Sequence, residues 1–190
     1  MPKTDRFTTV SLLSGLILLA AASRLLPHWP NFGPVGAMAL FGAASFSRKW
    51  MALVVPFAAL YLSDLALNNL VYGEYYTGFY WGFSTWVYVG FLLTVLLGFG
   101  MLRNRNFSWL RILGATGAGT AVFFLLTNFG VWLSSGMYPR SGAGLIAAYT
   151  AGLPFLLNSA AGNTLFAGLL FGAARYLSSR PVFAPLREEV

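Results

Sequence analysis

The sequence predicts an all-α integral membrane protein with six transmembrane helices in a single membrane domain, residues 1–190. The composition is 57% hydrophobic and the mean hydropathy is +0.68. Only 9% of the residues are charged, whereas soluble domains carry roughly a quarter. Apolar windows also recur along the chain between short polar breaks. Too little polar surface is left to keep such a chain in water.

A helix that crosses about 30 Å of hydrocarbon needs about 20 mostly apolar residues. Windows of this kind predict membrane helices over residues 7–26, 33–47, 50–70, 84–102, 108–135 and 154–178. The second is short and rich in Gly and Ala, and Pro34 suits its first turn. We expect it to pack among the other helices. Residues 141–152 are expected to form a separate short helix that caps one mouth of the bundle.

The Lys and Arg residues predict the orientation, because cytoplasmic loops carry an excess of them. An even number of spans with both termini in the cytoplasm places only Arg24 and Arg140 outside. The cytoplasmic set is then Lys3, Arg6, Arg48, Lys49, Arg103, Arg105, Arg111, Arg175, Arg180 and Arg187. The net charge of +7 is therefore interpreted as topogenic charge that faces membrane lipid, and nucleic acid is not an expected partner.

The sequence lacks the residues that several kinds of chemistry require. The chain has no Cys and one His, so thiol chemistry and metal sites are not expected. It has no Gly-rich phosphate loop with which to hydrolyse ATP. No sequence motif places a nucleophile beside a general base or brings metal ligands together. The sequence predicts neither an enzyme nor a cofactor.

Polar residues within membrane spans are costly and are candidates for function. Asp64 lies toward the outer end of the third span, one turn before Asn68. Two interpretations remain open for Asp64: an ion pair with Arg24 on the same side, or contact with a ligand or ion. His28, in the first outer loop, either packs that loop or contacts a ligand.

The remaining candidates gather at the same predicted outer side. Residues 72–83 hold seven aromatic side chains, which suits either an interfacial belt or a stacking surface for a ringed substrate. Asn128 and Trp132 lie on one face of the fifth span by i, i+4 spacing. The predicted substrate-binding set is His28, Asn31, Asp64, Asn68, Trp81, Asn128, Trp132, Tyr138 and Asn158.

Small residues repeat at spacing four, which lets helices approach closely. The pairs are Ser11 and Gly15, Ala39 and Ala43, Gly114 and Ala118, and Gly168 and Gly172. These faces either pack the bundle internally or dock another membrane protein, and the sequence does not choose between the two.

Four segments carry a resemblance to a known family. They are residues 27–42 (PHWPNFGPVGAMALFG), Ser63-Asp64, residues 127–132 (TNFGVW), and a stretch from Tyr138-Pro139 through residues 144–147 (GLIA) to Pro154-Phe155 and Asn158. In this order the chain resembles the S components, the substrate-binding membrane subunits of energy-coupling factor (ECF) vitamin transporters. It is most similar to a bacterial family of uncharacterised transport proteins of that type.

The resemblance implies a six-helix S-component-like bundle in the bacterial cytoplasmic (inner) membrane that binds a vitamin-like micronutrient from outside. An ECF transmembrane coupling subunit and cytoplasmic ATPases would energise uptake, and Ser11 and Gly15 would form a docking surface for the partner. The chain departs from the family pattern at Ala148, where relatives often have Cys, and at Asn163, where they often have Asp. Its ligand is then expected to differ from that of the relatives. An assignment of cobalamin as the ligand would depend on His28 alone.

Two rival functions stay open on the sequence. One is a structural or assembly membrane protein whose small-residue faces dock a partner. The other is an ion-coupled carrier that uses Asp64 and needs no ATPase.

Overall fold

The structure, a computed structural model, describes residues 3–178, and side chains from residue 8 onward. The regular secondary structure of these residues is entirely helical, with no strand. Its α-helices are α1 (Lys3–Ala22), α2 (Val35–Ser45), α3 (Lys49–Ala66), α4 (Thr85–Met101), α5 (Trp109–Ser134) and α6 (Gly142–Ser178). Two 3-10 turns, η1 (Ser23–Leu25) and η3 (Gly73–Tyr75), and a π-helical turn, η2 (Leu67–Val71), extend the ends of α1 and α3.

Four helical segments are long and apolar enough to cross a membrane, and they coincide with four of the six expected spans. They are Thr8–Leu25, Lys49–Val71, Trp109–Ser134 and Gly142–Ser178. The apolar helices α2 and α4 have 11 and 17 residues and fall below that length. At about 1.5 Å per residue, α2 is too short to cross the hydrocarbon alone.

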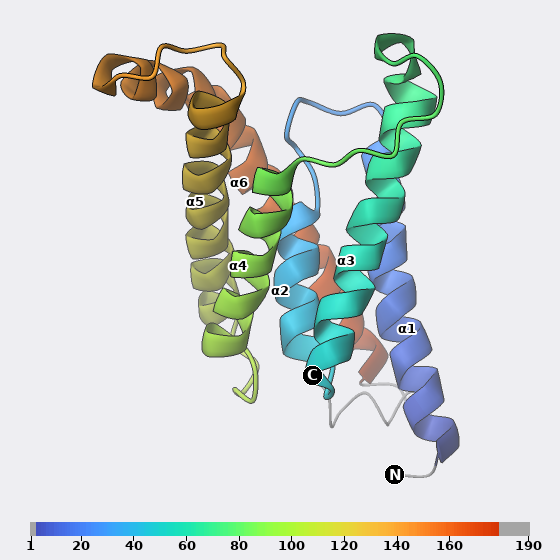
Figure 1. Ribbon diagram of the computed structural model, residues 1–190. Coiled ribbons are helices and arrows are strands. Elements are labelled where there is room, and N and C mark those ends of the chain that lie inside the picture. Colours follow the sequence, from blue (N-terminus) through green and yellow to red (C-terminus); the bar gives the residue numbers. More distant parts are fainter. Residues whose placement is uncertain (1–2, 179–190) are drawn as a thin grey trace.

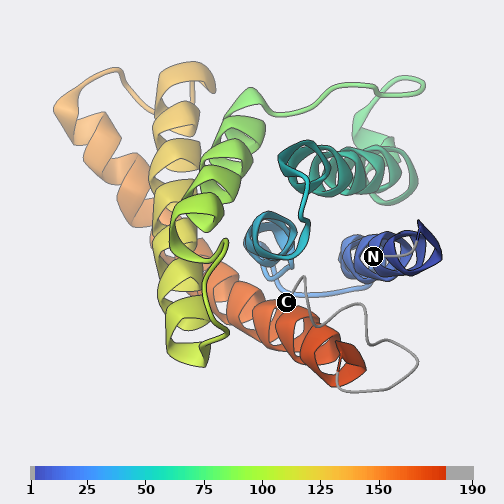
Figure 2. The same ribbon diagram turned by 90° about the horizontal axis from the view of Figure 1, so that it is seen from below.

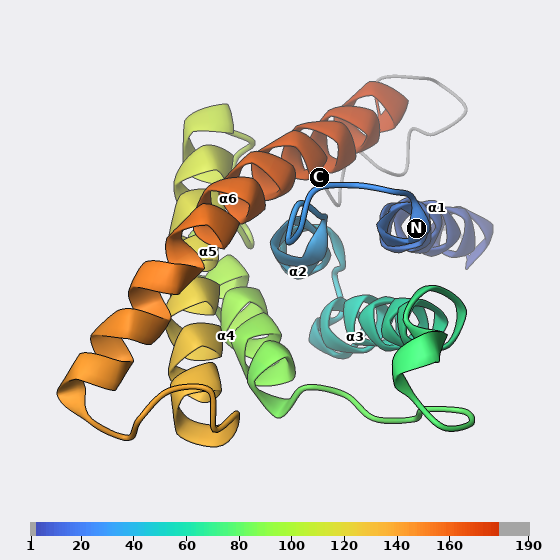
Figure 3. The same ribbon diagram turned by 90° about the horizontal axis from the view of Figure 1, so that it is seen from above.

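Helix α2 is the centre of the molecule, as expected from its small residues. It contacts α1, α3, α4, α5 and α6, and Figures 2 and 3 show it enclosed between α1 and α3 on one side and α4 and α6 on the other. Met38 and Phe41 of α2 are fully buried, and Phe41 meets Phe171 of α6 edge to face at 5.2 Å. The main-chain N–H groups at the start of α2 and the carbonyls at its end have no partners within the helix itself.

A side chain from α6 and one from the loop after α4 bond to the main chain at the two ends of α2. At its start, Asn163 of α6 accepts hydrogen bonds through Oδ1 from the main-chain N–H groups of Gly36 and Ala37. At its end, Arg103 donates to the main-chain oxygens of Ala43, Phe46 and Ser47. This short buried helix is stable because residues far away in the sequence supply hydrogen-bond partners for main-chain groups at its two ends.

The two ends of the bundle differ in composition, and we name them accordingly (Figure 1). The aromatic end holds residues 26–34, 67–84 and 135–141, and the basic end holds residues 46–48 and 102–108. Among the cationic side chains that the structure describes, Arg24 and Arg140 lie at the aromatic end. The basic end has Arg48, Lys49, Arg103, Arg105, Arg111 and Arg175. The charges of Arg180 and Arg187, and the side chains of Lys3 and Arg6, lie outside the described residues.

One expected boundary is wrong. Residues 141–152 do not form a separate capping helix, because α6 runs without interruption from Gly142 to Ser178 and contains Pro154. Proline removes one hydrogen bond but can be tolerated in a helix that packs against its neighbours. Gly152 lies so close to α5 that an added Cβ would be 2.4 Å from Asn128 Oδ1. Contact with α5 therefore holds this part of α6 in place on the N-terminal side of the proline.

Candidate functional site

Two adjoining cavities open at the aromatic end. The α5–α6 cavity has a volume of about 330 Å³, and the central cavity has a volume of about 320 Å³. Both are lined by Asn31, Phe123, Thr127, Ser159 and Asn163. These common walls make the two cavities neighbouring parts of one candidate site.

The α5–α6 cavity lies between two helix faces that the helical period creates. Residues 120, 123, 124, 127, 128 and 131 of α5 line one wall, and residues 148, 151, 152, 155, 156, 159 and 163 of α6 line the other. Both series follow the i, i+3, i+4 pattern, which keeps side chains on one helix face. Met137 and Tyr138 from the loop between the helices complete the cavity. Its polar groups are uncharged.

The central cavity is lined from more elements. Arg24 and His28 come from the end of α1 and the loop after it, Leu67 from η2, Val87 from α4, and residues 123 and 127 from α5. Tyr72 also lines it. The cavity therefore sits between the α1 to α3 side of the bundle and the α4 to α6 side.

The loop before α2 is fixed against α6. Asn158 Nδ2 donates to the main-chain oxygen of Pro30 at 2.9 Å, and Ser159 Oγ donates to that of Asn31 at 3.2 Å. Asn31 has a φ of 61°, in the left-handed region that Asn tolerates better than most residues. A Cβ on Gly162 would be 2.5 Å from the main-chain N of Gly33. The absence of a side chain at Gly162 lets the loop lie directly on α6.

Asp64 is engaged on both carboxylate oxygens. Oδ1 forms an ion pair with Arg24 at 2.6 Å, and Oδ2 accepts from the Tyr88 hydroxyl at 2.8 Å. The Arg24 and Asp64 side chains are only 14% and 15% exposed, and Arg24 also donates to Ser63 Oγ. Of the two interpretations of Asp64, the structure has the ion pair, and Asp64 lines neither cavity.

The aromatic segment 72–83 is tied back to α3 and η2. Asn69 accepts from the main-chain N of Tyr80 at 2.8 Å and donates to its oxygen at 3.0 Å. Trp81 is 66% exposed. Among the seven aromatic residues of the segment, Tyr72 alone lines a cavity. The described arrangement presents most of these rings outward.

The structure brings four of the nine expected site residues to the cavities: His28, Asn31, Asn128 and Tyr138. The other five, Asp64, Asn68, Trp81, Trp132 and Asn158, do not line them. Trp132 Nε1 donates instead to the main-chain oxygen of Pro139 at 3.0 Å, which holds the loop between α5 and α6. Asn158 holds the loop before α2, and Asn68 lies within η2.

The predicted substrate-binding set omits Phe123, Thr127, Ser159 and Asn163, although each lines both cavities. A signal was available, because 123 and 127, and 159 and 163, are i, i+4 pairs. The two departures from the family pattern, Ala148 and Asn163, also lie in the site. Ala148 lines the α5–α6 cavity, and Asn163 Nδ2 donates to Thr120 Oγ1 at 3.1 Å.

The small-residue pairs fall into two groups. Ala39 and Ala43 are buried, and a Cβ on Gly98 of α4 would be 2.7 Å from that of Ala43, so this pair packs the bundle internally. Ser11 is exposed, and no other side chain or neighbouring helix lies within 4 Å of a Cβ placed on Gly15. Gly114 and Gly168 are similarly open. Within the described chain, the α1 face therefore has no partner in close contact at Gly15.

No cluster of three or more His, Asp or Glu side chains in the described part of the chain could hold a metal ion. The fold and site thus define an all-helical protein with four segments of membrane-spanning character and a two-part cavity at its aromatic end. The chain belongs to DUF6580, a family of unknown function, whose model matches residues 4–185. No curated protein and no solved structure matches it.

Proposed function

We propose that this protein is a substrate-binding membrane subunit for uptake of a small micronutrient, vitamin-like or the precursor of a vitamin. It crosses the inner membrane six times, with both termini in the cytoplasm and the aromatic end outside. The excess of described cations at the basic end supports this orientation. Helix α2 would cross together with residues 26–34, in which α6 side chains bond the main-chain oxygens of Pro30 and Asn31, since irregular backbone within a membrane needs such partners.

The observation that carries the proposal is the pair of adjoining cavities at the predicted outer end. Pockets for small ligands typically have volumes of about 300 to 1,000 Å³ and combine apolar walls with a few placed polar groups. The cavities, about 330 and 320 Å³, have this character. Phe123, Phe124 and Phe155 supply apolar wall, and Thr127, Asn128 and Tyr138 supply neutral polar groups. These groups suit binding and orientation of a substrate.

Energy for uptake would come from separate partners, because the sequence contains no phosphate-binding loop. The resemblance to ECF S components points to a transmembrane coupling subunit and cytoplasmic ATPases. The open α1 face at Ser11 and Gly15 is available for such a partner. An ion-coupled carrier is less well supported, since both oxygens of Asp64 are engaged outside the cavities.

Native mass spectrometry of the full chain in mild detergent, after expression in rich medium, tests the proposal by looking for a bound small molecule. Ala148→Phe fills the α5–α6 cavity, and Asn128→Leu removes an amide from its wall. Ile146→Phe is the matched control, because Ile146 is 68% exposed on the same helix and lines no cavity. Thermal unfolding of each variant identifies any loss of the fold.

We expect a discrete added mass in the original protein and in Ile146→Phe, and its loss from the two cavity variants. Asn128→Leu covers the case in which the larger side chain at 148 unfolds the protein. A consistently bare chain, or one that carries only another membrane protein, would replace the proposal with the assembly function.

A further inference from the structure

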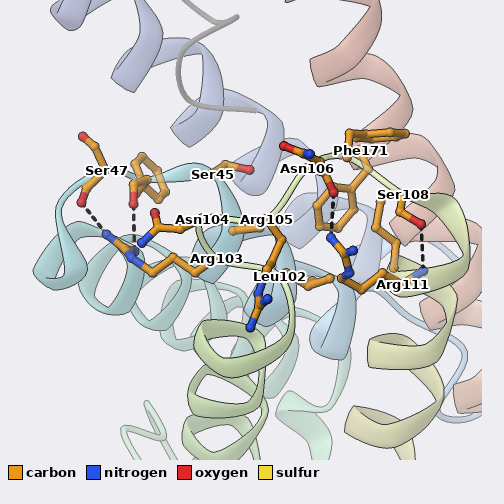
Figure 4. Close-up of a pocket in the computed structure, with 14 residues that line it drawn as sticks. Ser45, Ser47, Leu102, Arg103, Asn104, Arg105, Asn106, Ser108, Arg111 and Phe171 are labelled. Carbon is orange, nitrogen blue, oxygen red and sulfur yellow. Dashed lines mark hydrogen bonds between the residues drawn. The ribbon is translucent and has the colours of Figure 1, made fainter.

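A third cavity, of about 260 Å³, lies at the basic end (Figure 4). We name it the arginine cavity. It is formed by the end of α2 and the residues after it, the loop between α4 and α5, the first turn of α5, and Phe171 of α6. Arg103, Arg105 and Arg111 line it, and no Asp or Glu does.

The three arginines have only neutral partners among the described side chains. Arg103 donates to the main-chain oxygen of Phe46 at 3.0 Å, and Arg111 donates to that of Asn106 at 2.7 Å. Arg105 is exposed. The ion pair found in the described part of the chain, between Arg24 and Asp64, is at the opposite end. Because main-chain oxygens carry no net charge, the described groups that line the cavity are net positive.

The geometry fixes two of these cations and adds a helix end. Hydrogen bonds fix the guanidinium groups of Arg103 and Arg111 against main-chain oxygens, and each group has further N–H donors beyond those bonds. The 26-residue helix α5 begins there, and Ser108 Oγ accepts from the main-chain N of Arg111. The positive end of its dipole adds to the same field. A small cavity lined by three arginines and no carboxylate suits an anion with several oxygens, such as phosphate.

The surroundings favour a phosphate carried by a lipid. Trp50 and Trp109, which are 55% and 44% exposed, lie at the basic ends of α3 and α5, where aromatic rings mark the headgroup level. Leu110 and Leu113, beside Arg111 in the first turns of α5, are 82% and 48% exposed. Their surface would receive acyl chains. Basic pockets between membrane helices on the cytoplasmic side bind anionic headgroups in other proteins.

We infer that the arginine cavity binds the phosphate of an anionic lipid headgroup, with the acyl chains against the Leu110 and Leu113 face of α5. This site is distinct from the substrate cavities and lies at the other end of the bundle. It depends on the membrane embedding proposed above but not on the substrate.

The test compares retention of dioleoyl-phosphatidylglycerol and dioleoyl-phosphatidylcholine by the full chain, titrated in mild detergent and read by native mass spectrometry. Arg105→Gln with Arg111→Gln removes two cavity cations and leaves the contacts of Arg103. The matched control is Arg48→Gln with Lys49→Gln, which removes two exposed cations at the same end that line no described cavity. Thermal unfolding checks the fold of both.

We expect the cavity variant to lose on the order of a hundredfold in affinity for phosphatidylglycerol, given about tenfold for each hydrogen bond to a charged group. The control should change much less, and phosphatidylcholine should bind weakly throughout. Equal losses of phosphatidylglycerol affinity in the two variants would mean that diffuse surface charge binds the lipid, and would overturn the proposal of a site in the arginine cavity. Displacement of phosphatidylglycerol by equimolar inorganic phosphate would contradict the inference that the bound phosphate belongs to a lipid. Because no substrate is present, failure here leaves the proposed uptake function untouched.

Discussion

The aromatic and basic ends of this molecule differ in whether their arginine side chains are paired with a carboxylate. At the aromatic end, Arg24 is matched by a carboxylate and a hydroxyl, and the adjoining cavities are lined largely by neutral groups. At the basic end, Arg103 and Arg111 bond to main-chain oxygens and keep their charge unmatched within the described part of the chain. A neutral cavity suits a small uncharged or weakly polar ligand, whereas unmatched cations suit an anionic surface.

Helix α2 shows the same difference on a smaller scale. The neutral amide oxygen of Asn163 accepts hydrogen bonds from the first N–H groups of α2. The guanidinium of Arg103 donates hydrogen bonds to the main-chain oxygens at the other end. One cap comes from α6 and the other from the loop between α4 and α5. The two ends of the bundle are therefore coupled through one buried helix, and substitutions at either cap act on the same core.

The largest effect is expected for Asp64→Ala. The change leaves the Arg24 guanidinium, 14% exposed, without its carboxylate, and it leaves the Tyr88 hydroxyl without its acceptor. Breaking one side of a buried ion pair costs about 3 kcal/mol or more. We expect a loss of that size in the free energy of unfolding, measured by denaturant unfolding in detergent micelles.

Glu74→Ala is the control for that loss, because Glu74 is an exposed carboxylate at the same end. It should change stability by less than about 0.5 kcal/mol. The double variant with Arg24→Ala should recover part of the loss, since no unpaired charge remains. Equal stability of Asp64→Ala and Glu74→Ala would mean that the aromatic end does not depend on its matched charge.

The sequence allowed the helical class and most of the six apolar segments to be predicted, because length and hydropathy follow directly from composition. The boundaries of α2, α4 and α5 fell within two residues of expectation. The break at Pro154 was wrong because tertiary contact between Gly152 and α5 outweighs the local preference of proline.

The site was harder to predict, because polarity does not show what a side chain contacts. Asp64, Trp132 and Asn158 are uncommon residues at the expected end, yet each bonds to the protein itself. Thr127 and Ser159 are ordinary residues, and they line the cavities through their helix faces. Helical spacing would have found them once α5 and α6 were known to face each other.

A second prediction uses two glycines of α6 to sharpen the contrast along that helix. Gly162→Ala would place a Cβ 2.5 Å from the main chain of Gly33. A backbone cannot move aside as a flexible side chain does, so we expect a loss of about 1 to 3 kcal/mol. Gly168→Ala meets nothing within 4 Å and should raise stability by up to about 1 kcal/mol through helix propensity.

Thermal unfolding of the two glycine variants in detergent gives the comparison directly, because the shifts should have opposite signs. A destabilised Gly168→Ala would point to close packing on the open face of α6. A Gly162→Ala variant as stable as the original chain would show that the loop before α2 can leave α6 without cost.

The smallest of the three effects is expected at the cap of α2, and it bears most directly on the cavities. Asn163→Ala removes the acceptor of the Gly36 and Ala37 N–H groups and the donor to Thr120. Two N–H groups then lack their acceptor, and we expect a loss of about 1 kcal/mol, the typical cost of losing a helix N-cap. Asn163→Asp keeps an acceptor oxygen at the positive end of α2 and should be the more stable of the two variants.

The same pair separates stability from binding, because Asn163 lines both cavities. If Asn163 serves only as a cap, Asn163→Asp should restore the unfolding temperature and leave any co-purified ligand in place. If the cavities bind a substrate suited to neutral walls, the same variant should be stable and yet lose or exchange that ligand. We expect the second result, since a carboxylate in the common wall adds a charge that the rest of the site does not match.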